Sequence, residues 1–496
     1  METIIDTYDV GSLEDVPCMR VSGAITSRPV DFGLGHYVIS VTGTDLSDYR
    51  KYIEVLEEAG FEKEKDKMTD NELVALSIFR KEMLRVWVTY IAPQNRTYVG
   101  AHFEKLSKWN AEIVFEQVPF DMFTKEQRSE VRDCGAGNYI MQVSDVSEEK
   151  FGQYLQNLDE AEYVKRVDNG EELYDAVYSA TYQKQGLVLT VTYVNKSETL
   201  YLSARMNLPI SEHLQYKSQY IAGNHEGART TLHMLKTQRN TSGYVIQLKN
   251  GHFILHDCDF ECAGGTLITY LESLVPQGEK PIVEAWFVSH GNDNCCAALC
   301  EIANKPEYAE RICVKGIYYN EPSDDVMALF PTCWQRVKYI RKAAEWFDAK
   351  LYRPQIGQRY YFNDISIDVL MAQEQLPMEQ TCGEFNDSTT WLVYNIEGQK
   401  CLFSGDGNRR GMQYIMDTYS QEYMKFDIFT APGRGWNTSR TFTDYCTVKT
   451  VLFCGEQIPE HVIKANNYLK EHAKEWISWE GKTRVLTFPY EIGQYK

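Results

Sequence analysis

The sequence predicts an α/β protein whose first 210 residues contain a duplicated α+β region. Two observations lead to this fold class. The stretch from Phe253 to Asn320 alternates strand-like and helix-like patterns, with a buried strand over 282–289, a polar loop and a helix from about Cys296. In addition, two segments near the N-terminus align when the chain is compared with itself. Because α/β layers present functional groups at the carboxyl ends of strands, we expect the polar loop after residue 289 to decide the function.

The N-terminal duplication rests on apolar positions that align without a gap. Tyr37 to Val41 matches Tyr139 to Val143. The following apolar residues match in order, Tyr49, Tyr52, Ile53, Leu56, Ala59 and Phe61 with Phe151, Tyr154, Leu155, Leu158, Ala161 and Tyr163. We therefore expect a first α+β repeat over 1–120 and a second over 121–210.

Within each copy the pattern predicts one strand, one helix and a small antiparallel sheet. Tyr49 to Leu56 shows the i, i+3, i+4, i+7 spacing of an amphipathic helix, with Asp45 or Ser47 as its cap. The alternating runs 85–91 and 97–103 flank an Ala-Pro-Gln-Asn turn and predict a hairpin. His102 aligns with Arg205, so no catalytic residue is duplicated. An alternative to a packed core is an aromatic groove between the repeats for a partner or ligand.

Composition limits the class of protein and its partners. A chain of 496 residues with 43% hydrophobic residues should form two or three globular domains. A net charge of −19 argues against a nucleic-acid partner, which normally requires Lys and Arg to neutralise phosphates. No apolar run approaches the ~20 residues of a membrane span. The absence of a signal-peptide pattern and the 13 irregularly spaced cysteines predict reduced thiols in the cytoplasm.

A polar connector over 211–240 is expected to be partly helical and to form a linker. The domain 241–496 should open with a hairpin over 241–257, because Asn250-Gly251 separates two apolar runs. A helix is expected over 334–349, followed near the C-terminus by a strand over 448–453, a helix over 458–473 and a strand over 484–490.

The run EAWFVSHGNDNCCAALCEI, residues 284–302, resembles the metallo-β-lactamase superfamily, in which the equivalent strand ends in H-x-H-x-D-H. His290 stands at the first histidine position and Asn292 at the second. Asn294 stands at the aspartate position and Cys295 at the last histidine position. Three of these four positions have therefore changed.

Three further segments carry the same resemblance. The run KCLFSGD ends at Asp406, which stands where the family has a carboxylate bridging two metals. DIFTAPGRGWN resembles DILKVPHHGSN, with Gly433 and Arg434 at the two histidine positions. Asp257 ends the opening hairpin, where the family usually has Asp-Gly-Gly. Covering about 241–490, the resemblance implies a four-layer αββα sandwich.

These substitutions predict that the dinuclear metal centre is lost. A hydrolytic zinc site needs imidazoles and carboxylates with one position open for water, and an asparagine side chain is a poor zinc ligand. Arg434 would repel a cation and is expected to pair with Asp406. The degenerate cleft comprises Asp257, His290, Asn292, Asp293, Asn294, Cys295, Asp406 and Arg434.

The leading hypothesis is therefore a non-catalytic binding, scaffold or regulatory protein that needs no cofactor. Its ligand would be an unknown small molecule or protein, and a homo- or hetero-oligomer, including a pair with an active homologue, is consistent with this reading.

The alternative hypothesis is a metal-dependent hydrolase of the ester or phosphodiester class. A rebuilt site would hold zinc or another divalent metal through His290, Asp293, Cys295 and Asp406. A metal-free variant would use Cys295 as nucleophile and His290 as base. A redox role for the neighbouring Cys295 and Cys296 is a third alternative.

Overall fold

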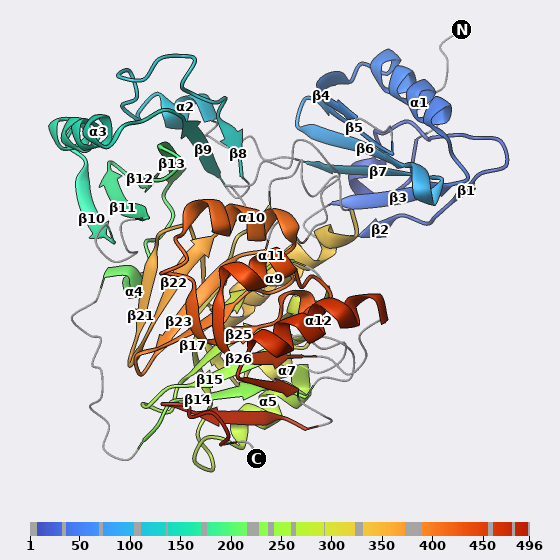
Figure 1. Ribbon diagram of the computed structural model, residues 1–496. Coiled ribbons are helices and arrows are strands. Elements are labelled where there is room, and N and C mark those ends of the chain that lie inside the picture. The colour runs from blue at the N-terminus through green and yellow to red at the C-terminus, as the bar shows by residue number, and fades with distance from the viewer. Residues whose placement is uncertain are drawn as a thin grey trace, which may run out of the picture. The chain divides into compact units, whose positions relative to one another are not determined.

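The computed structural model describes residues 7–31, 36–68, 73–103, 111–134, 137–169, 176–215, 228–236, 243–258, 264–291, 293–322, 331–372, 386, 389–454, 460–478 and 482–494. The chain divides into two units. Met1–Lys108 forms most of the first unit, and the second comprises Trp109–Pro322, Tyr339–Leu376 and Phe385–Lys496. The predicted mixed α/β character is confirmed in the ribbon diagram (Figure 1).

The first unit is a mainly antiparallel sheet with the strand order β1-β3-β7-β6-β5-β4. Its elements are β1 (Ile25–Thr26), β2 (Val30–Asp31), β3 (Tyr37–Thr42), α1 (Leu46–Glu58), β4 (Glu62–Met68), β5 (Val74–Lys81), β6 (Leu84–Ile91) and β7 (Arg96–Phe103). Helix α1 buries its expected stripe, Tyr49, Tyr52, Ile53 and Leu56, in the core of this unit. The aromatic positions of this helix therefore pack inward and do not line a groove.

The second unit begins with a sheet of the same design. Its elements are α2 (Ala111–Phe115), β8 (Arg132–Asp133), β9 (Asn138–Val143), α3 (Glu148–Glu160), β10 (Val164–Asp168), β11 (Val177–Lys184), β12 (Leu187–Val194) and β13 (Thr199–Met206). The strand order is β10-β11-β12-β13-β9-β8, so β9 to β13 follow the order of β3 to β7 in the first unit. Phe151, Tyr154 and Leu158 of α3 are buried against this sheet.

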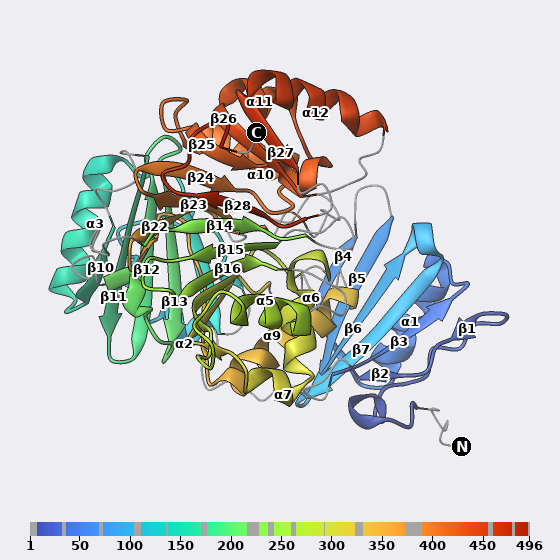
Figure 2. The same ribbon diagram turned by 90° about the horizontal axis from the view of Figure 1, so that it is seen from below.

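Two larger sheets follow, and both mix parallel and antiparallel pairs (Figure 2). One has the order β20-β19-β17-β16-β15-β14-β28, with β18 beside β17. Its strands are β14 (Thr231–Met234), β15 (Gly243–Gln247), β16 (Phe253–Asp257), β17 (Ile282–Val288), β18 (Cys313–Val314), β19 (Gly316–Tyr319), β20 (Lys350–Tyr352) and β28 (Arg484–Thr487).

The other large sheet runs from β21 to β27 in sequence order. Its strands are β21 (Arg359–Phe362), β22 (Ile365–Met371), β23 (Trp391–Ile396), β24 (Gln399–Phe403), β25 (Lys425–Thr430), β26 (Thr447–Phe453) and β27 (Glu475–Ser478). One hydrophobic core joins the two sheets, with Ile254 and Phe287 from the first and Leu392 and Ile428 from the second. The helices are α4 (Glu212–Gln215), α5 (Gly264–Glu272), α6 (Asp293–Ala303), α7 (Pro306–Ala309), α9 (Pro331–Phe347), α10 (Arg409–Thr418), α11 (Arg440–Tyr445) and α12 (Glu460–His472).

Two boundaries differ from the sequence-based expectations. Helix α6 begins at Asp293, not near Cys296, because Asp is a residue type favoured in the first turn of a helix. The connector 211–240 contains α4 and β14, and β14 pairs with both β15 and β28. Its Thr231–Met234 segment is therefore part of the large sheet.

The parallel strand pairs bring separate loops to one edge of the core. Strands β16 and β17 pair in parallel and end at Asp257 and Val288. Strands β24 and β25 also pair in parallel and end at Phe403 and Thr430. The loops after these four strands hold the predicted site residues. Within the described ranges, no helix has the length and apolar character that crossing a bilayer requires.

Replacing Asp45 by Ala should loosen the start of α1. The Asp45 carboxylate accepts a hydrogen bond from the Asp48 amide at 2.9 Å, and the Asp48 carboxylate accepts one from the Asp45 amide. Loss of such a cap costs about 1 kcal/mol, so hydrogen exchange at the Asp48 amide should accelerate about fivefold. Ser147→Ala at the equivalent end of α3 is the matched variant, and its effect should be confined to α3.

Candidate functional site

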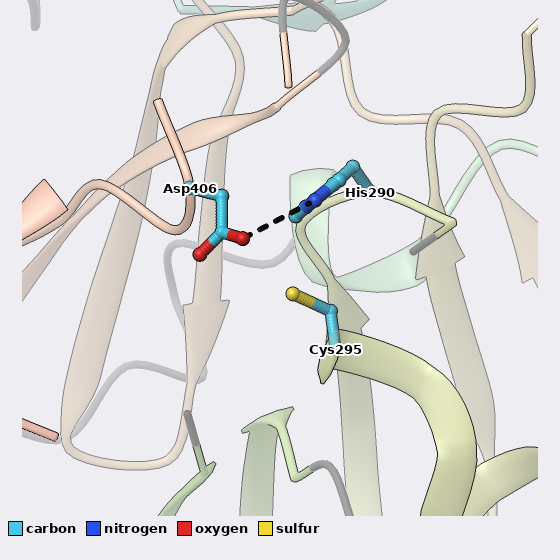
Figure 3. Close-up of side chains that lie close together, drawn as sticks. All are labelled: His290, Cys295 and Asp406. Carbon is cyan, nitrogen blue, oxygen red and sulfur yellow. Dashed lines mark ion pairs between the residues drawn. The ribbon is translucent and has the colours of Figure 1, made fainter. Parts of the chain in front are cut away.

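His290, Cys295 and Asp406 converge at the edge of the two large sheets (Figure 3). His290 follows β17, Cys295 lies in the first turn of α6, and Asp406 follows β24. One ligand atom from each lies within 4.8 Å of the others, and His290 Nε2 is 3.9 Å from Asp406 Oδ2. All three side chains are buried, with relative exposures of 0%, 0% and 2%.

Gly405 allows Asp406 to approach the strand that carries His290. Its backbone is left-handed, with φ of +49°, and an added Cβ would lie 2.9 Å from the Ser289 Cβ and 2.7 Å from the Thr389 Cγ2. Both distances are shorter than a normal contact, so only glycine fits here. The Thr390 backbone amide donates to the Ser289 carbonyl at 2.9 Å, and this bond joins the segment before β23 to the loop that carries His290.

The Arg434 guanidinium contacts the Asp406 carboxylate directly. Its Nη2 donates to Asp406 Oδ2 at 3.2 Å, as expected from the sequence. Arg434 has a left-handed φ of 60°, which costs a non-glycine residue about 1 kcal/mol. The Gly433 backbone N–H donates to the Gly405 carbonyl at 2.8 Å, and the side-chain Nδ2 of Asn437 donates to the Asp406 carbonyl at 2.8 Å. These bonds hold the Arg434 turn against the Asp406 loop.

Asp257 and Ser289 orient His290 from the other side. The Ser289 amide donates to Asp257 Oδ1 at 2.8 Å, and the Ser289 hydroxyl donates to Asp257 Oδ2 at 3.0 Å. The same hydroxyl oxygen lies 3.0 Å from His290 Nδ1. The Asp257 carbonyl accepts from Trp286 Nε1 at 2.8 Å, which fixes the turn. Sequence reasoning missed Ser289, although its position directly before His290 at a strand end could have indicated it.

Burial determines the charge states of this group. It raises the pKa of Asp257 to about 7, against the opposing effect of the Ser289 hydrogen bonds. Burial also lowers the pKa of His290, while the Asp406 carboxylate acts in the opposite direction. The pKa of the Cys295 thiol is raised well above its usual value, again mainly by burial. A protonated, buried thiol is a poor nucleophile, which counts against the metal-free hydrolase alternative.

The structure brings together five of the eight predicted cleft residues, Asp257, His290, Cys295, Asp406 and Arg434. Asn292 lies outside the described residues, as do the side chains of Asp293 and Asn294, whose backbones begin α6. Neither Cys295 nor Cys296 forms a disulfide within the described part of the chain. The sulfur of Cys296 lies 3.9 Å from that of Cys300, one helical turn further on.

A second buried polar group, also missed from the sequence, lies behind Asp257. His256 Nδ1 is 2.9 Å from the Tyr394 hydroxyl, and His256 Nε2 is 3.6 Å from Asp257 Oδ2. Burial lowers the pKa of His256 to about 3, so this histidine is neutral. His256 gave no motif signal, because a single histidine after the apolar run Phe253 to Leu255 matches no ligand spacing.

The donor set does not fit a dinuclear centre. Among the described residues it offers one imidazole, one thiol and one carboxylate, and a guanidinium already binds that carboxylate. A single zinc ion fits better. Its tetrahedral ligands lie about 3.5 Å apart, close to the 3.9 Å between His290 and Asp406. Such an ion would have to compete with Arg434 for Asp406.

Comparisons with known proteins give structural matches only. No protein-family model matches the sequence, and no curated protein matches it. The metallo-β-lactamase fold protein YhfI from Bacillus subtilis matches with 12% identity and a TM-score of 0.36, covering 52% of this chain and 99% of that chain.

Two further solved structures match over similar lengths. CmlA, a diiron β-hydroxylase from Streptomyces venezuelae, has 10% identity and a TM-score of 0.33, covering 53% of this chain and 54% of that chain. Zn²⁺-bound PqqB from Methylobacterium extorquens has 10% identity and a TM-score of 0.26, covering 45% of this chain and 64% of that chain.

Asp257→Asn should change how stability depends on pH. Because burial raises the pKa of Asp257 from 3.8 to about 7, the folded state holds a proton that the unfolded state loses in this window. Asp257 therefore makes the free energy of unfolding fall as the pH rises from about 4 to about 7. The difference in this free energy between the parent protein and Asp257→Asn, measured by urea unfolding, should shift in favour of the variant across that window. A difference that is independent of pH would contradict the shifted pKa.

Proposed function

We propose that this protein is a metallo-β-lactamase-fold protein that has lost its dinuclear metal centre and acts as a non-catalytic binding, scaffold or regulatory protein. The proposal includes a four-layer αββα sandwich over 241–496, preceded by two α+β repeats over 1–120 and 121–210. The shared core of the two large sheets supports the sandwich. The matching strand orders of the two smaller sheets support the duplication.

The ion pair between Arg434 and Asp406 carries the functional proposal. In the family that the motifs resemble, the equivalent carboxylate bridges two cations. A guanidinium about 4 Å from a divalent ion repels it by several kcal/mol at an effective dielectric constant near 20. Arg434 supplies positive charge to Asp406 without a metal, so the loop keeps its charge balance while the hydrolytic centre is lost.

The burial of the cluster also argues against hydrolysis. A catalytic zinc site keeps one coordination position open to water or substrate. His290 and Cys295 have no exposed surface, and Asp406 is only 2% exposed. A closed cluster of this kind is suited to stabilising the loops around it, and recognition of a small-molecule or protein ligand would then use other surfaces.

The alternative is a single-metal site formed by His290, Cys295 and Asp406, and the proximity of their ligand atoms supports it. If loaded, the site would supply a Lewis acid for a hydrolase of the ester or phosphodiester class. His290 would be oriented for metal binding by Ser289 at its Nδ1. Asp293, the fourth predicted ligand, has its side chain outside the described residues.

Metal analysis of the full chain separates these readings. After incubation with zinc or manganese and removal of unbound ions, we expect substoichiometric metal by elemental mass spectrometry. Stoichiometric metal that disappears in Asp406→Ala would sink the non-catalytic proposal and favour the single-metal alternative.

Arg434→Met should destabilise the protein, because it leaves the buried Asp406 carboxylate without its guanidinium. Removing one partner of a buried ion pair costs about 3 kcal/mol or more, so the melting temperature should fall by several degrees. Zinc should restore part of this loss in the variant while leaving the parent protein unchanged, because the ion replaces the missing positive charge.

Arg440→Met is the control for this experiment. Arg440 is an exposed arginine of α11, stacked over the Tyr468 ring at 4.9 Å, and its replacement should change the melting temperature little. Equal losses in the Arg434 and Arg440 variants would show that Arg434 has no special role in the cleft.

A further inference from the structure

A buried arginine, Arg205, lies in the sheet of the second repeat and outside the group of His290, Cys295 and Asp406. Arg205 of β13 is paired in register with Asn138 of β9. Leu202 and Ala204 of β13 pack into the core beneath α3, so the alternating residues Ser203 and Arg205 lie on the opposite face of the sheet. Arg205 is only 4% exposed and Asn138 only 1% exposed.

A chain of hydrogen bonds fixes the direction of the polar groups around this pair. Gln355 Nε2, which can only donate, lies 2.8 Å from the Ser203 hydroxyl oxygen. The Ser203 hydroxyl therefore donates onward to Asn138 Oδ1, at 2.9 Å. This uses the acceptor of Asn138 and leaves its amide nitrogen as a donor. Asn138 Nδ2 and Arg205 Nε are both buried without a hydrogen-bond partner among the described residues.

The charge around Arg205 is also unbalanced. No carboxylate of the described residues lies within 4.0 Å of its guanidinium, and Glu321 and Asp368, on the neighbouring segments, pair with Arg341 and Arg359. Two ionisable groups act on the pKa of Arg205, the Tyr360 phenol and a second arginine, Arg353. Burial raises the pKa of Tyr360, so the phenol is neutral. Arg353 is itself 8% exposed and donates to the Glu321 carbonyl at 2.6 Å. Burial lowers the pKa of Arg205 to about 10, so the guanidinium is still charged at neutral pH.

Among the described residues, Asn138 Nδ2 and Arg205 Nε thus present two buried donors and a positive charge without a hydrogen-bond acceptor of their own. Leaving a buried charge without a counter-ion is costly, and a donor-only arrangement is complementary to a group that only accepts. Phosphate, sulfate and carboxylate groups are such acceptors, and the planar guanidinium matches two of their oxygens.

We propose that Arg205 and Asn138 bind the oxyanion of a phosphate- or carboxylate-bearing small molecule, between the sheet of the second repeat and the β20–β21 loop that carries Arg353 and Gln355. This site is independent of the proposed loss of the metal centre, so either proposal can fail without the other.

The first repeat shows that the site is particular to the second. At the equivalent positions it has His36 and His102, whose rings stack with centroids 4.8 Å apart. His36 Nε2 accepts from Trp87 Nε1 at 2.9 Å, and burial lowers the pKa of His36 so that it is neutral. At the position of Arg205 the first repeat therefore has the imidazole of His102 and not a permanently charged guanidinium.

The experiment compares melting temperatures of the full chain in sodium phosphate, sodium sulfate, sodium acetate and sodium chloride at equal ionic strength. We expect a saturable rise with at least one oxyanion over chloride, because an anion that binds only the folded state stabilises it. A response to phosphate and sulfate would indicate a phosphate-bearing ligand, and a response to acetate alone a carboxylate. The rise should be absent in Arg205→Met and retained in Arg166→Met, which removes an exposed arginine from β10 of the same sheet.

An anion that stays bound through purification would hide this response, so the purified protein is also denatured and the released anions and small acids are identified by mass spectrometry. About one equivalent released from the parent protein, and none from Arg205→Met, would also support the site. No released oxyanion together with no rise in melting temperature would overturn the proposal. An equal rise in Arg205→Met would overturn it as well.

Asn138→Asp gives an independent test with a variant of nearly the same shape. Its carboxylate would lie opposite Arg205 and replace the bound oxyanion from within the chain. We expect a higher melting temperature in chloride and no further response to phosphate, sulfate or acetate. A lower melting temperature in chloride would show that Arg205 does not lack a negative partner, and would contradict the proposal.

Discussion

The buried group of His290, Cys295 and Asp406 depends on the balance of charge at Asp406. Its carboxylate is buried, and it lies 3.2 Å from the Arg434 guanidinium and 3.9 Å from His290. A buried carboxylate needs a cation or strong donors to remain ionised. The Arg434 guanidinium on the neighbouring loop supplies positive charge to this carboxylate. The left-handed backbone at Arg434 and the hydrogen bond between Gly433 and Gly405 both serve to hold that arginine in place.

The polar residues around this pair behave as a single network. Asp257 holds Ser289 by two hydrogen bonds, and the Ser289 hydroxyl contacts His290, which faces Asp406. In metal sites such outer contacts orient a histidine ligand, and here they fix the position of the His290 ring. His290 and Asp406 also have a structural role, because their contact joins the β17 loop to the β24 loop.

Much of this arrangement could be predicted from the sequence, because strand ends and turns have strong local signals. The Asn250-Gly251 hairpin, the stripe of α1 and the pairing of Arg434 with Asp406 all followed from residue patterns. The start of α6 was wrong by three residues, since helix caps depend on a few local polar groups that compete with the apolar pattern. Ser289 and His256 could not be identified, because their roles come from contacts with Asp257 and Tyr394 across the fold.

The sheets of β3 to β7 and of β9 to β13 show how one strand order can hold different chemistry. Their five core strands follow one order, so equivalent side chains reach equivalent places in the sheets. At one such place the first repeat has two histidines, one of them bonded to Trp87, and the second has Asn138 and Arg205. An arginine stays charged at any physiological pH, whereas a buried histidine can become neutral. The guanidinium of Arg205 therefore gives the sheet of β9 to β13 a fixed positive charge, which the proposed oxyanion would balance.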